Sequence, residues 1–237
     1  MLTHPDPASG TSHLPLAGYH DHIRHDVLDH VTGHVTGHVP GHGQGHCGNV
    51  LDFGGGIGAT AMFLKAIGQA HRAGVADMVA NEGALQGLDF AMTGNLNDPA
   101  FIHHIYQQHG PFDTILALDI LEHLLDPWSV VSVLQEALVP GGRLIISVPN
   151  ARSYKLVLPL LFLNRWTYRD AGILDRTHIR FFVRSTACEL VTDAGLKVEK
   201  TAASTYGSRM VRLFRLLTLG LLNSFTDRQY IVIARKV

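Results

Sequence analysis

Cysteine is nearly absent from this chain of 237 residues, which contains only Cys47 and Cys188. Two cysteines are too few for the disulfide framework that stabilises small secreted domains. The opening residues also lack the basic and then apolar pattern of a secretory signal. We therefore expect a cytoplasmic protein.

The chain also lacks an excess of charge of one sign, because 19 Lys and Arg residues balance 20 Asp and Glu residues. A nucleic-acid-binding domain is typically basic overall, since it must neutralise backbone phosphates. With a net charge of −1, this composition argues against a nucleic-acid partner.

No hydrophobic run is long enough to span a bilayer, which takes about 20 apolar residues in a helix. The longest runs cover residues 156–163 and 213–222, and Arg215 interrupts the second. We expect no transmembrane segment and expect the first run to pack on the sheet. Contact of either run with a lipid carrier at a membrane surface is the alternative, so peripheral membrane contact stays open.

Residues 1–48 differ in composition from the rest of the chain and contain ten of its 16 histidines. We expect a largely disordered leader in which residues 19–31 form a short helix that covers a sheet. Four histidines recur every fourth residue, but the interleaved glycines and Pro40 disfavour a helix there. A solvated tail is therefore favoured over transition-metal capture. These histidines are His34, His38, His42 and His46.

The most informative stretch covers residues 50–58, V-L-D-F-G-G-G-I-G, followed by A-T-A-M-F-L-K-A-I. A buried strand that breaks into a glycine turn and then a helix is typical of the nucleotide-binding corner of a Rossmann-type sheet. Gly54, Gly56 and Ala59 also match the dinucleotide fingerprint, so this motif alone leaves a nicotinamide-dependent oxidoreductase open.

A second segment, residues 110–150, contains D-T-I-L-A-L-D-I-L-E-H-L-L-D-P and then L-V-P-G-G-R-L-I-I-S-V-P-N. Together with the glycine motif, it resembles the class I S-adenosylmethionine-dependent methyltransferases, in motif order and spacing. The resemblance runs from about residue 48 to the C-terminus. It favours a methyltransferase over the oxidoreductase, which does not account for Asp52 or for the L-D-I-L-E-H strand end.

The resemblance and the alternation of strand-like and helix-like segments imply an α/β fold. We expect a Rossmann-like, doubly wound, seven-stranded sheet, mostly parallel with an antiparallel C-terminal hairpin, and with helices on both faces. The predicted strands cover residues 49–53, 74–79, 88–93, 114–118, 143–148, 197–202 and 230–234. The predicted helices cover 59–70, 129–138, 185–194 and 208–222. The methyltransferase domain would extend from 49 to 237, with a substrate-cap insertion at about 151–183.

The resemblance also implies that S-adenosylmethionine is the cofactor and assigns residues to it. The glycine loop would accommodate the methionine part, with Asp52 near its amine. The ribose acid should end the second strand, where Asp77 is preferred to Glu82. The turn after the third strand offers Asn95 to adenine, with Asp98 as the second candidate. The predicted cofactor residues are Asp52, Gly54, Gly56, Gly58, Asp77, Asn95 and Asp119.

Asp119, Glu122 and His123 follow the fourth strand at a spacing that would bring them together on a helical turn. In the favoured interpretation Asp119 lines the methionine pocket and the other two shape the loop. Alternatively, His123 is a general base for a hydroxyl acceptor. The trio also resembles the acid-x-x-Glu-His metal pattern of ubiquinone-pathway O-methyltransferases, although no metal is our primary expectation.

The predicted cap contains D-R-T-H-I-R-F-F at residues 175–182. This run resembles a subgroup of methyltransferases of cell-surface polysaccharide and glycan biosynthesis, which implies a sugar or glycan acceptor contacted by His178. The structural alternative is that its aromatics are core and its charged residues fix the cap in place. We therefore predict O-methylation of a small-molecule, sugar or glycan acceptor, with His123 and His178 as the catalytic candidates. A catalytically silent cofactor-binding module is the remaining alternative, and the sequence leaves the oligomeric state open.

Overall fold

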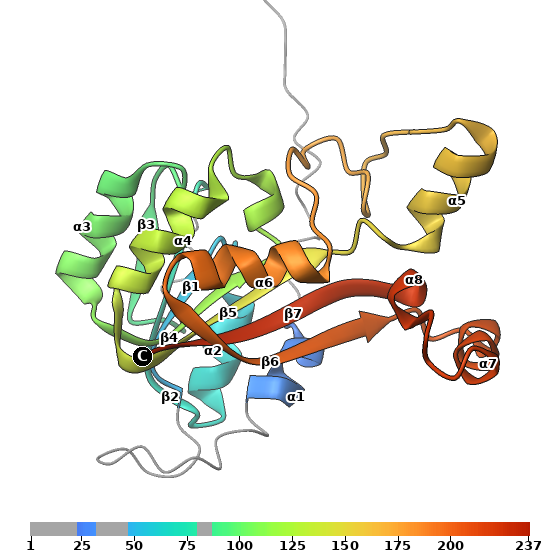
Figure 1. Ribbon diagram of the computed structural model, residues 1–237. Helices are drawn as coiled ribbons and strands as arrows, with labels where there is room; N and C mark the ends of the chain where they lie inside the picture. Colours follow the sequence, from blue (N-terminus) through green and yellow to red (C-terminus); the bar gives the residue numbers. More distant parts are fainter. Residues whose placement is uncertain (1–22, 32–46, 80–86) are drawn as a thin grey trace, which may run out of the picture.

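The computed structural model of the chain describes residues 23–31, 47–79 and 87–237. Seven strands form one sheet in the order β3-β2-β1-β4-β5-β7-β6 (Figure 1). The strands are β1 (Gly48–Phe53), β2 (Ala70–Asp77), β3 (Phe90–Thr93), β4 (Phe112–Leu118), β5 (Leu138–Pro149), β6 (Leu196–Thr205) and β7 (Asp227–Lys236). The first five pair in parallel, and β7 is antiparallel to both β5 and β6.

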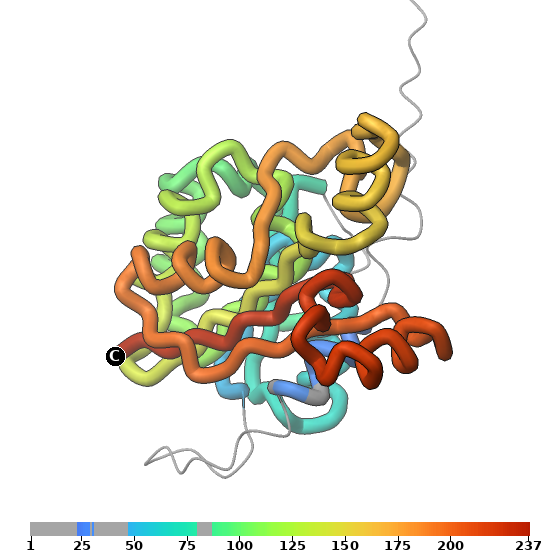
Figure 2. The backbone as a smooth tube through the Cα atoms, turned by 45° about the vertical axis from the view of Figure 1, so that its right-hand side comes forward, coloured from blue at the N-terminus to red at the C-terminus, as the bar shows by residue number. Residues whose placement is uncertain are grey.

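Helices cover both faces of this sheet, as Figure 2 shows from a second direction. They are α1 (His25–Val31), α2 (Ala59–Ala66), α3 (Pro99–His109), α4 (Pro127–Glu136), α5 (Tyr154–Leu163), α6 (Arg184–Asp193), α7 (Arg209–Leu217) and α8 (Asn223–Thr226), with a short 3₁₀ turn η2 (Leu121–His123). On one face, α3, α4 and α6 pack through buried side chains into the larger apolar core. On the other, α1 and α2 form the second core. The predicted fold class is confirmed.

The short helix expected within residues 19–31 is present as α1, where Val27 and Leu28 are buried against the second core. Residues 19–22 and the four-residue histidine repeat lie outside the described residues. The structure therefore leaves the disordered leader, its solvated histidine tail and its boundary at residue 48 as predictions.

Several element boundaries differ from those expected. The second strand is Ala70–Asp77 rather than 74–79, because α2 ends early at Ala66. The Pro140-Gly141-Gly142 segment lies within β5 instead of forming a turn before it. The helix predicted at 208–222 stops at Leu217, since Leu219 adopts a left-handed conformation with φ of 48°.

Three helices had not been predicted from the sequence, namely α3, α5 and the four-residue α8. The first, α3, begins at Pro99 with Asp98 as its N-cap and buries Ile102 and Ile105. The second, α5, lies within the predicted cap. The expected packing of residues 156–163 on the sheet is wrong apart from Leu156, the only buried residue of that helix.

Candidate functional site

The glycine loop joins β1 to α2 at the carboxyl edge of the parallel strands. The N–H of Gly54 donates to Ala76 O on the neighbouring strand at 2.7 Å. Gly54, Gly56 and Gly58 all have positive φ, between 57° and 76°, which side chains with a Cβ rarely adopt. A Cβ on Gly55 would collide with the carboxyl carbon of Asp52. The loop therefore requires glycine for its conformation and for its close approach to that acid.

Asp52 is 3% exposed and is the penultimate residue of β1, directly before this loop. Burial and, to a smaller extent, the nearby Asp77 raise the pKa of its carboxyl to about 7, although a backbone hydrogen bond from Ala61 lowers it. A carboxyl group in this state gains from a cation placed beside it, because the cation stabilises the ionised form.

Asp77 is the last residue of β2, at the position predicted for the ribose acid. Its Oδ2 accepts a hydrogen bond of 2.8 Å from the N–H of Gly56, and its Oδ1 accepts from Val79 N at 3.1 Å. These bonds hold the carboxylate at the glycine loop, where a hydroxyl pair could approach it. The competing candidate, Glu82, lies outside the described residues.

Asn95 follows β3 and is exposed at the same edge. Its Oδ1 accepts from Asn97 N at 3.0 Å, so part of its hydrogen-bonding capacity fixes the turn. The second adenine candidate, Asp98, caps α3 by accepting from Ala100 N at 2.9 Å. A structural role for Asp98 leaves Asn95 as the better candidate for the adenine contact.

Asp119 follows β4 in a left-handed conformation with φ of 54°, and its side chain lies in a polar network. Its Oδ1 accepts from Ser147 Oγ at 2.9 Å and from Gln229 Nε2 at 2.7 Å. Its Oδ2 forms an ion pair with Arg24, which precedes α1. Sequence reasoning missed Arg24, because no local pattern links it to a residue 95 positions away.

Arg24 contacts two elements at the carboxyl edge of the sheet, the first turn of α2 and the end of β5. Its backbone N–H donates to Thr60 Oγ1 in the first turn of α2 at 3.3 Å, and its guanidinium also reaches Ser147 Oγ at 3.2 Å. Asp26 holds the same guanidinium at 2.9 Å. The leader thus contributes a cation to an edge otherwise lined by carboxylates.

The expected cluster of Asp119, Glu122 and His123 does not form. Asp119 turns toward Arg24, and His178 from the predicted cap takes its place. Polar ligand atoms of Glu122, His123 and His178 all lie within 4.8 Å of one another. Backbone N–H groups of Ile179 and Arg180 donate to Glu122 O at 2.9 and 3.0 Å, which holds the cap segment on η2.

The two imidazoles of this cluster lie edge to face, with ring centroids 4.7 Å apart. His123 Nδ1 is 3.2 Å from Thr177 O, and His178 Nδ1 is 3.0 Å from Ile173 O. A carbonyl oxygen only accepts, so each Nδ1 carries a proton and donates. In the neutral rings, each Nε2 therefore carries the lone pair.

Glu122 lies beside these lone pairs and is 1% exposed, and among the described residues neither of its carboxylate oxygens has a hydrogen-bond partner. His178 Nε2 is 3.9 Å from Glu122 Oε1. Burial, with help from the nearby Asp119, raises the pKa of Glu122 well above its ordinary value. Burial and the neighbouring His178 lower the pKa of His123. The carboxylate oxygens of Glu122 and the Nε2 lone pairs of the two histidines thus surround a space suited to a cation or a proton.

A cavity of about 770 Å³ lies beside this cluster, beneath α5. It extends from His178 and Gln229 to the apolar residues of α5 and Tyr206. Gln229 also donates a hydrogen bond to Asp119, so the cavity adjoins the polar network around Asp119 and Arg24. Four basic residues line it, namely Lys155, Arg165, Arg169 and Arg228.

Comparison with known proteins identifies the family. A family model described as a methyltransferase domain matches residues 31–201. Ubiquinone biosynthesis O-methyltransferase from Hydrogenovibrio crunogenus is 26% identical over 69% of this chain and 68% of its own length. The protein of the same name from Thiobacillus denitrificans is 28% identical over 54% and 51%, respectively. The chain thus spans about half to two thirds of these relatives.

Solved structures show the same fold at low sequence identity. A SAM-dependent methyltransferase from Archaeoglobus fulgidus has a TM-score of 0.56 at 16% identity, covering 90% of both chains. Magnesium protoporphyrin IX methyltransferase from Synechocystis PCC 6803 with bound SAH has a TM-score of 0.53 at 17% identity, covering 80% of this chain and 74% of that one. The chain belongs to the methyltransferase-domain family, and its fold is that of the S-adenosylmethionine-dependent methyltransferases.

Proposed function

We propose that the protein transfers a methyl group from S-adenosylmethionine to an oxygen atom of an acceptor bound in the cavity beneath α5. The observation that carries this proposal is the position of the cavity, which meets the cofactor corner at Gln229 and the acid–base cluster at His178. The sulfonium makes the methyl group electrophilic, so holding an oxygen in line behind it supplies much of the acceleration.

The cofactor would lie across the carboxyl edge of β1, β2, β3 and β4. Asp77 would accept from the ribose hydroxyls, and Asn95 would contact adenine. The amino-acid end of the cofactor carries an ammonium and a carboxylate. Asp52 and Asp119 suit the ammonium, and Arg24 beside Asp119 suits the carboxylate. The Gly54–Gly58 backbone then lets this end approach closely.

The acceptor would combine an anionic group with an apolar or ring-shaped part. Lys155, Arg165, Arg169 and Arg228 provide the positive charge, while Leu156, Leu163 and Tyr206 provide apolar surface. A sugar or glycan with a phosphate meets this description, as the D-R-T-H-I-R-F-F run led us to predict. A hydroxylated aromatic acid, closer to what the names of the ubiquinone relatives suggest, meets it as well.

His123 and His178 would remove the acceptor proton. The lone pairs on their Nε2 atoms make both rings competent bases, and the lowered pKa of His123 keeps that ring neutral near pH 7. His178 lines the cavity directly, which makes it the better placed of the two to contact the acceptor.

The proposal is tested by following labelled methyl transfer to a panel of acceptors, including sugar phosphates and hydroxylated aromatic acids. We expect turnover with an anionic hydroxyl acceptor. His178→Gln should lower kcat at least about tenfold while cofactor affinity is unchanged. His103→Gln, an exposed position on α3, is the matched control. Cofactor binding without transfer to any hydroxyl acceptor would instead indicate the silent module.

A divalent cation at Glu122, His123 and His178 is a second candidate, favoured by the two unpartnered carboxylate oxygens beside two Nε2 lone pairs. One carboxylate and two imidazoles fit Zn²⁺, Mn²⁺ or Fe²⁺, and the hydrogen bonds on each Nδ1 orient the rings as they do in metal sites. The ion would polarise an acceptor oxygen. Co²⁺ absorption titration tests it: a saturable ligand-field band lost in His178→Gln supports the site, and its absence contradicts it.

A further inference from the structure

Helix α7 exposes its apolar face to solvent instead of packing it against the core. Surface helices normally direct their apolar stripe toward the core. Here the side chains Met210, Leu213, Phe214 and Leu217 follow the i, i+3, i+4, i+7 spacing of one helix face. They are exposed, with Met210 at 82% and Leu217 at 73%. The apolar face of α7 is therefore directed outward.

The opposite side of α7 holds the helix on the fold. Val211 is its only buried residue. Arg215 donates to Thr226 Oγ1 at 2.7 Å and pairs with Asp227 at the start of β7. This anchoring by a buried valine and an arginine means that the outward orientation of the leucines is set by the fold.

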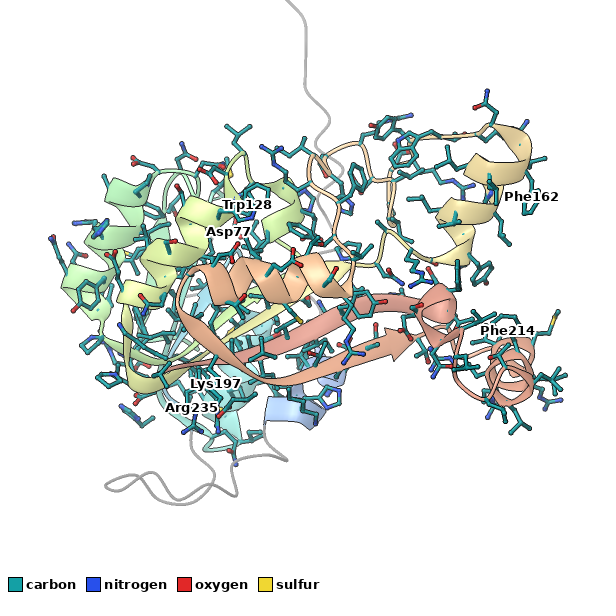
Figure 3. All side chains as sticks on the ribbon, viewed as in Figure 1. Asp77, Trp128, Phe162, Lys197, Phe214 and Arg235 are labelled. Atoms are coloured by element: carbon teal, nitrogen blue, oxygen red, sulfur yellow. The ribbon has the colours of Figure 1, made fainter. Side chains whose placement is uncertain are left out.

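Helix α5 presents a second apolar face at the same end of the molecule. Leu158, Leu161 and Phe162 share a helix face, and Phe162 is 72% exposed. Phe162 and Phe214 both lie at the end of the molecule away from Lys197 (Figure 3). The two helices are linked through the ring of Tyr206, which contacts the Tyr154 ring at 6.0 Å and lies beneath Lys155 Nζ at 3.8 Å.

The two chain segments that carry this apolar surface are basic. Residues 151–169 and 205–222 contain seven of the 19 Lys and Arg residues of the chain and none of its 20 Asp and Glu residues. A two-fold dimer through this surface would place basic residues opposite their own copies, which is unfavourable. An anionic partner with an apolar interior matches both properties.

We propose that α5 and α7 form a docking surface for the headgroup region of an anionic lipid bilayer. The outward leucines and phenylalanines enter the boundary between headgroups and acyl chains, and the flanking arginines contact lipid phosphates. Arg209 is exposed at the side of the α7 apolar face and Arg212 is exposed one turn further along the helix, and their long side chains would snorkel to reach those phosphates. The surface is independent of which acceptor the enzyme methylates.

Vesicle flotation with the full chain tests this proposal. Neutral phosphatidylcholine vesicles are compared with vesicles that contain about 30% phosphatidylglycerol, for which we expect at least about tenfold more bound protein. Leu213→Glu/Leu217→Glu should reduce binding at least about tenfold, whereas Val237→Glu, at an equally exposed terminal valine, should not. Arg209→Ala/Arg212→Ala should weaken binding to anionic vesicles, and Lys197→Ala should not.

Thermal melting and S-adenosylmethionine binding of each variant show whether it is folded. Equal binding to neutral and anionic vesicles would overturn the proposal, as would no binding to either. Sedimentation of the free protein as a dimer that Leu213→Glu/Leu217→Glu dissociates, without vesicle binding, would assign the surface to a second copy instead.

Discussion

His178 and Glu122 are 56 residues apart in the sequence, yet His178 Nε2 lies 3.9 Å from Glu122 Oε1 in a buried pair. The cap segment brings His178 there by docking its backbone on η2. Their proximity gives the cap a chemical role, because it completes a cluster with His123 beside the cavity. In the part of the chain that the structure describes, the buried Glu122 carboxyl group has no hydrogen-bond partner.

Replacing Glu122 with glutamine should stabilise the metal-free protein at alkaline pH. Burial raises the pKa of Glu122 well above 4.5, so the folded state binds its proton more tightly than the unfolded state. The free energy of unfolding therefore falls as pH rises above the unfolded pKa. Glu122→Gln removes this loss, and its Tm should exceed that of the wild type at pH 8 but not at pH 4. Thermal melts in EDTA at both pH values measure this difference, and an equal Tm at pH 8 would contradict it.

Gly55→Ala should impair both folding stability and cofactor binding. The new Cβ collides with the carboxyl carbon of Asp52, a buried group with little room to move. Overpacking of this kind typically destabilises by about 1–3 kcal/mol, and the displaced loop should weaken binding at least about tenfold. Gly207→Ala, whose Cβ would meet no atom within 4 Å, is the matched control. Similar Tm and Kd values for the two variants would show that the loop tolerates the side chain.

Arg24→Ala should weaken S-adenosylmethionine binding by about 10- to 100-fold, because it removes the charge-assisted pair that we propose between Arg24 and the cofactor carboxylate. Arg143→Ala provides the control, since Arg143 pairs with Glu199 on the surface, away from this edge. Calorimetry of both variants measures the effect. Adenosine, which lacks the amino-acid end, should bind the wild type and Arg24→Ala equally, and a loss for both ligands would instead indicate a structural role.

If His123 acts as a base, the pH dependence of kcat should follow the ionisation of its ring. Burial and His178 hold its pKa below the ordinary value of 6.5, so the ring is deprotonated at neutral pH. We expect kcat to be constant from about pH 7 upward and to fall below pH 6.5 as the ring gains a proton. His123→Asn should lower kcat and remove this acidic limb. An unchanged limb in the variant would assign it to another group.

The strands could be predicted because a parallel sheet requires continuous apolar runs. Each of the first four strands also ends in, or is followed directly by, a glycine or an acid. The α3 helix was missed although Asp98 and Pro99 provide an N-cap and a favoured first residue. Its apolar positions, Ile102 and Ile105, are too few to dominate a polar segment. Local sequence patterns are thus sufficient to predict strands that are buried on both faces, but they predict short polar helices less well.

His178 was predicted as a site residue, but the contacts between site residues from distant segments could not be predicted. The motif spacing placed Asp119 with Glu122, but the left-handed backbone at Asp119 directs its side chain toward Arg24. The partners of Glu122 and Asp119, which are His178 and Arg24, come from an insertion and from the leader. Neither has a sequence spacing that would indicate the contact, since tertiary packing alone brings them together.

The most direct test of the proposed cofactor site is the contribution of Asp77 to S-adenosylmethionine affinity, measured by calorimetric titration. We expect the wild type to bind with a Kd on the order of micromolar and Asp77→Ala to bind at least about tenfold more weakly. Asp193→Ala, an exposed acid at the end of α6, should bind as the wild type does. No heat of binding at about 1 mM ligand, or equal affinity of wild type and Asp77→Ala, would contradict the proposed cofactor site.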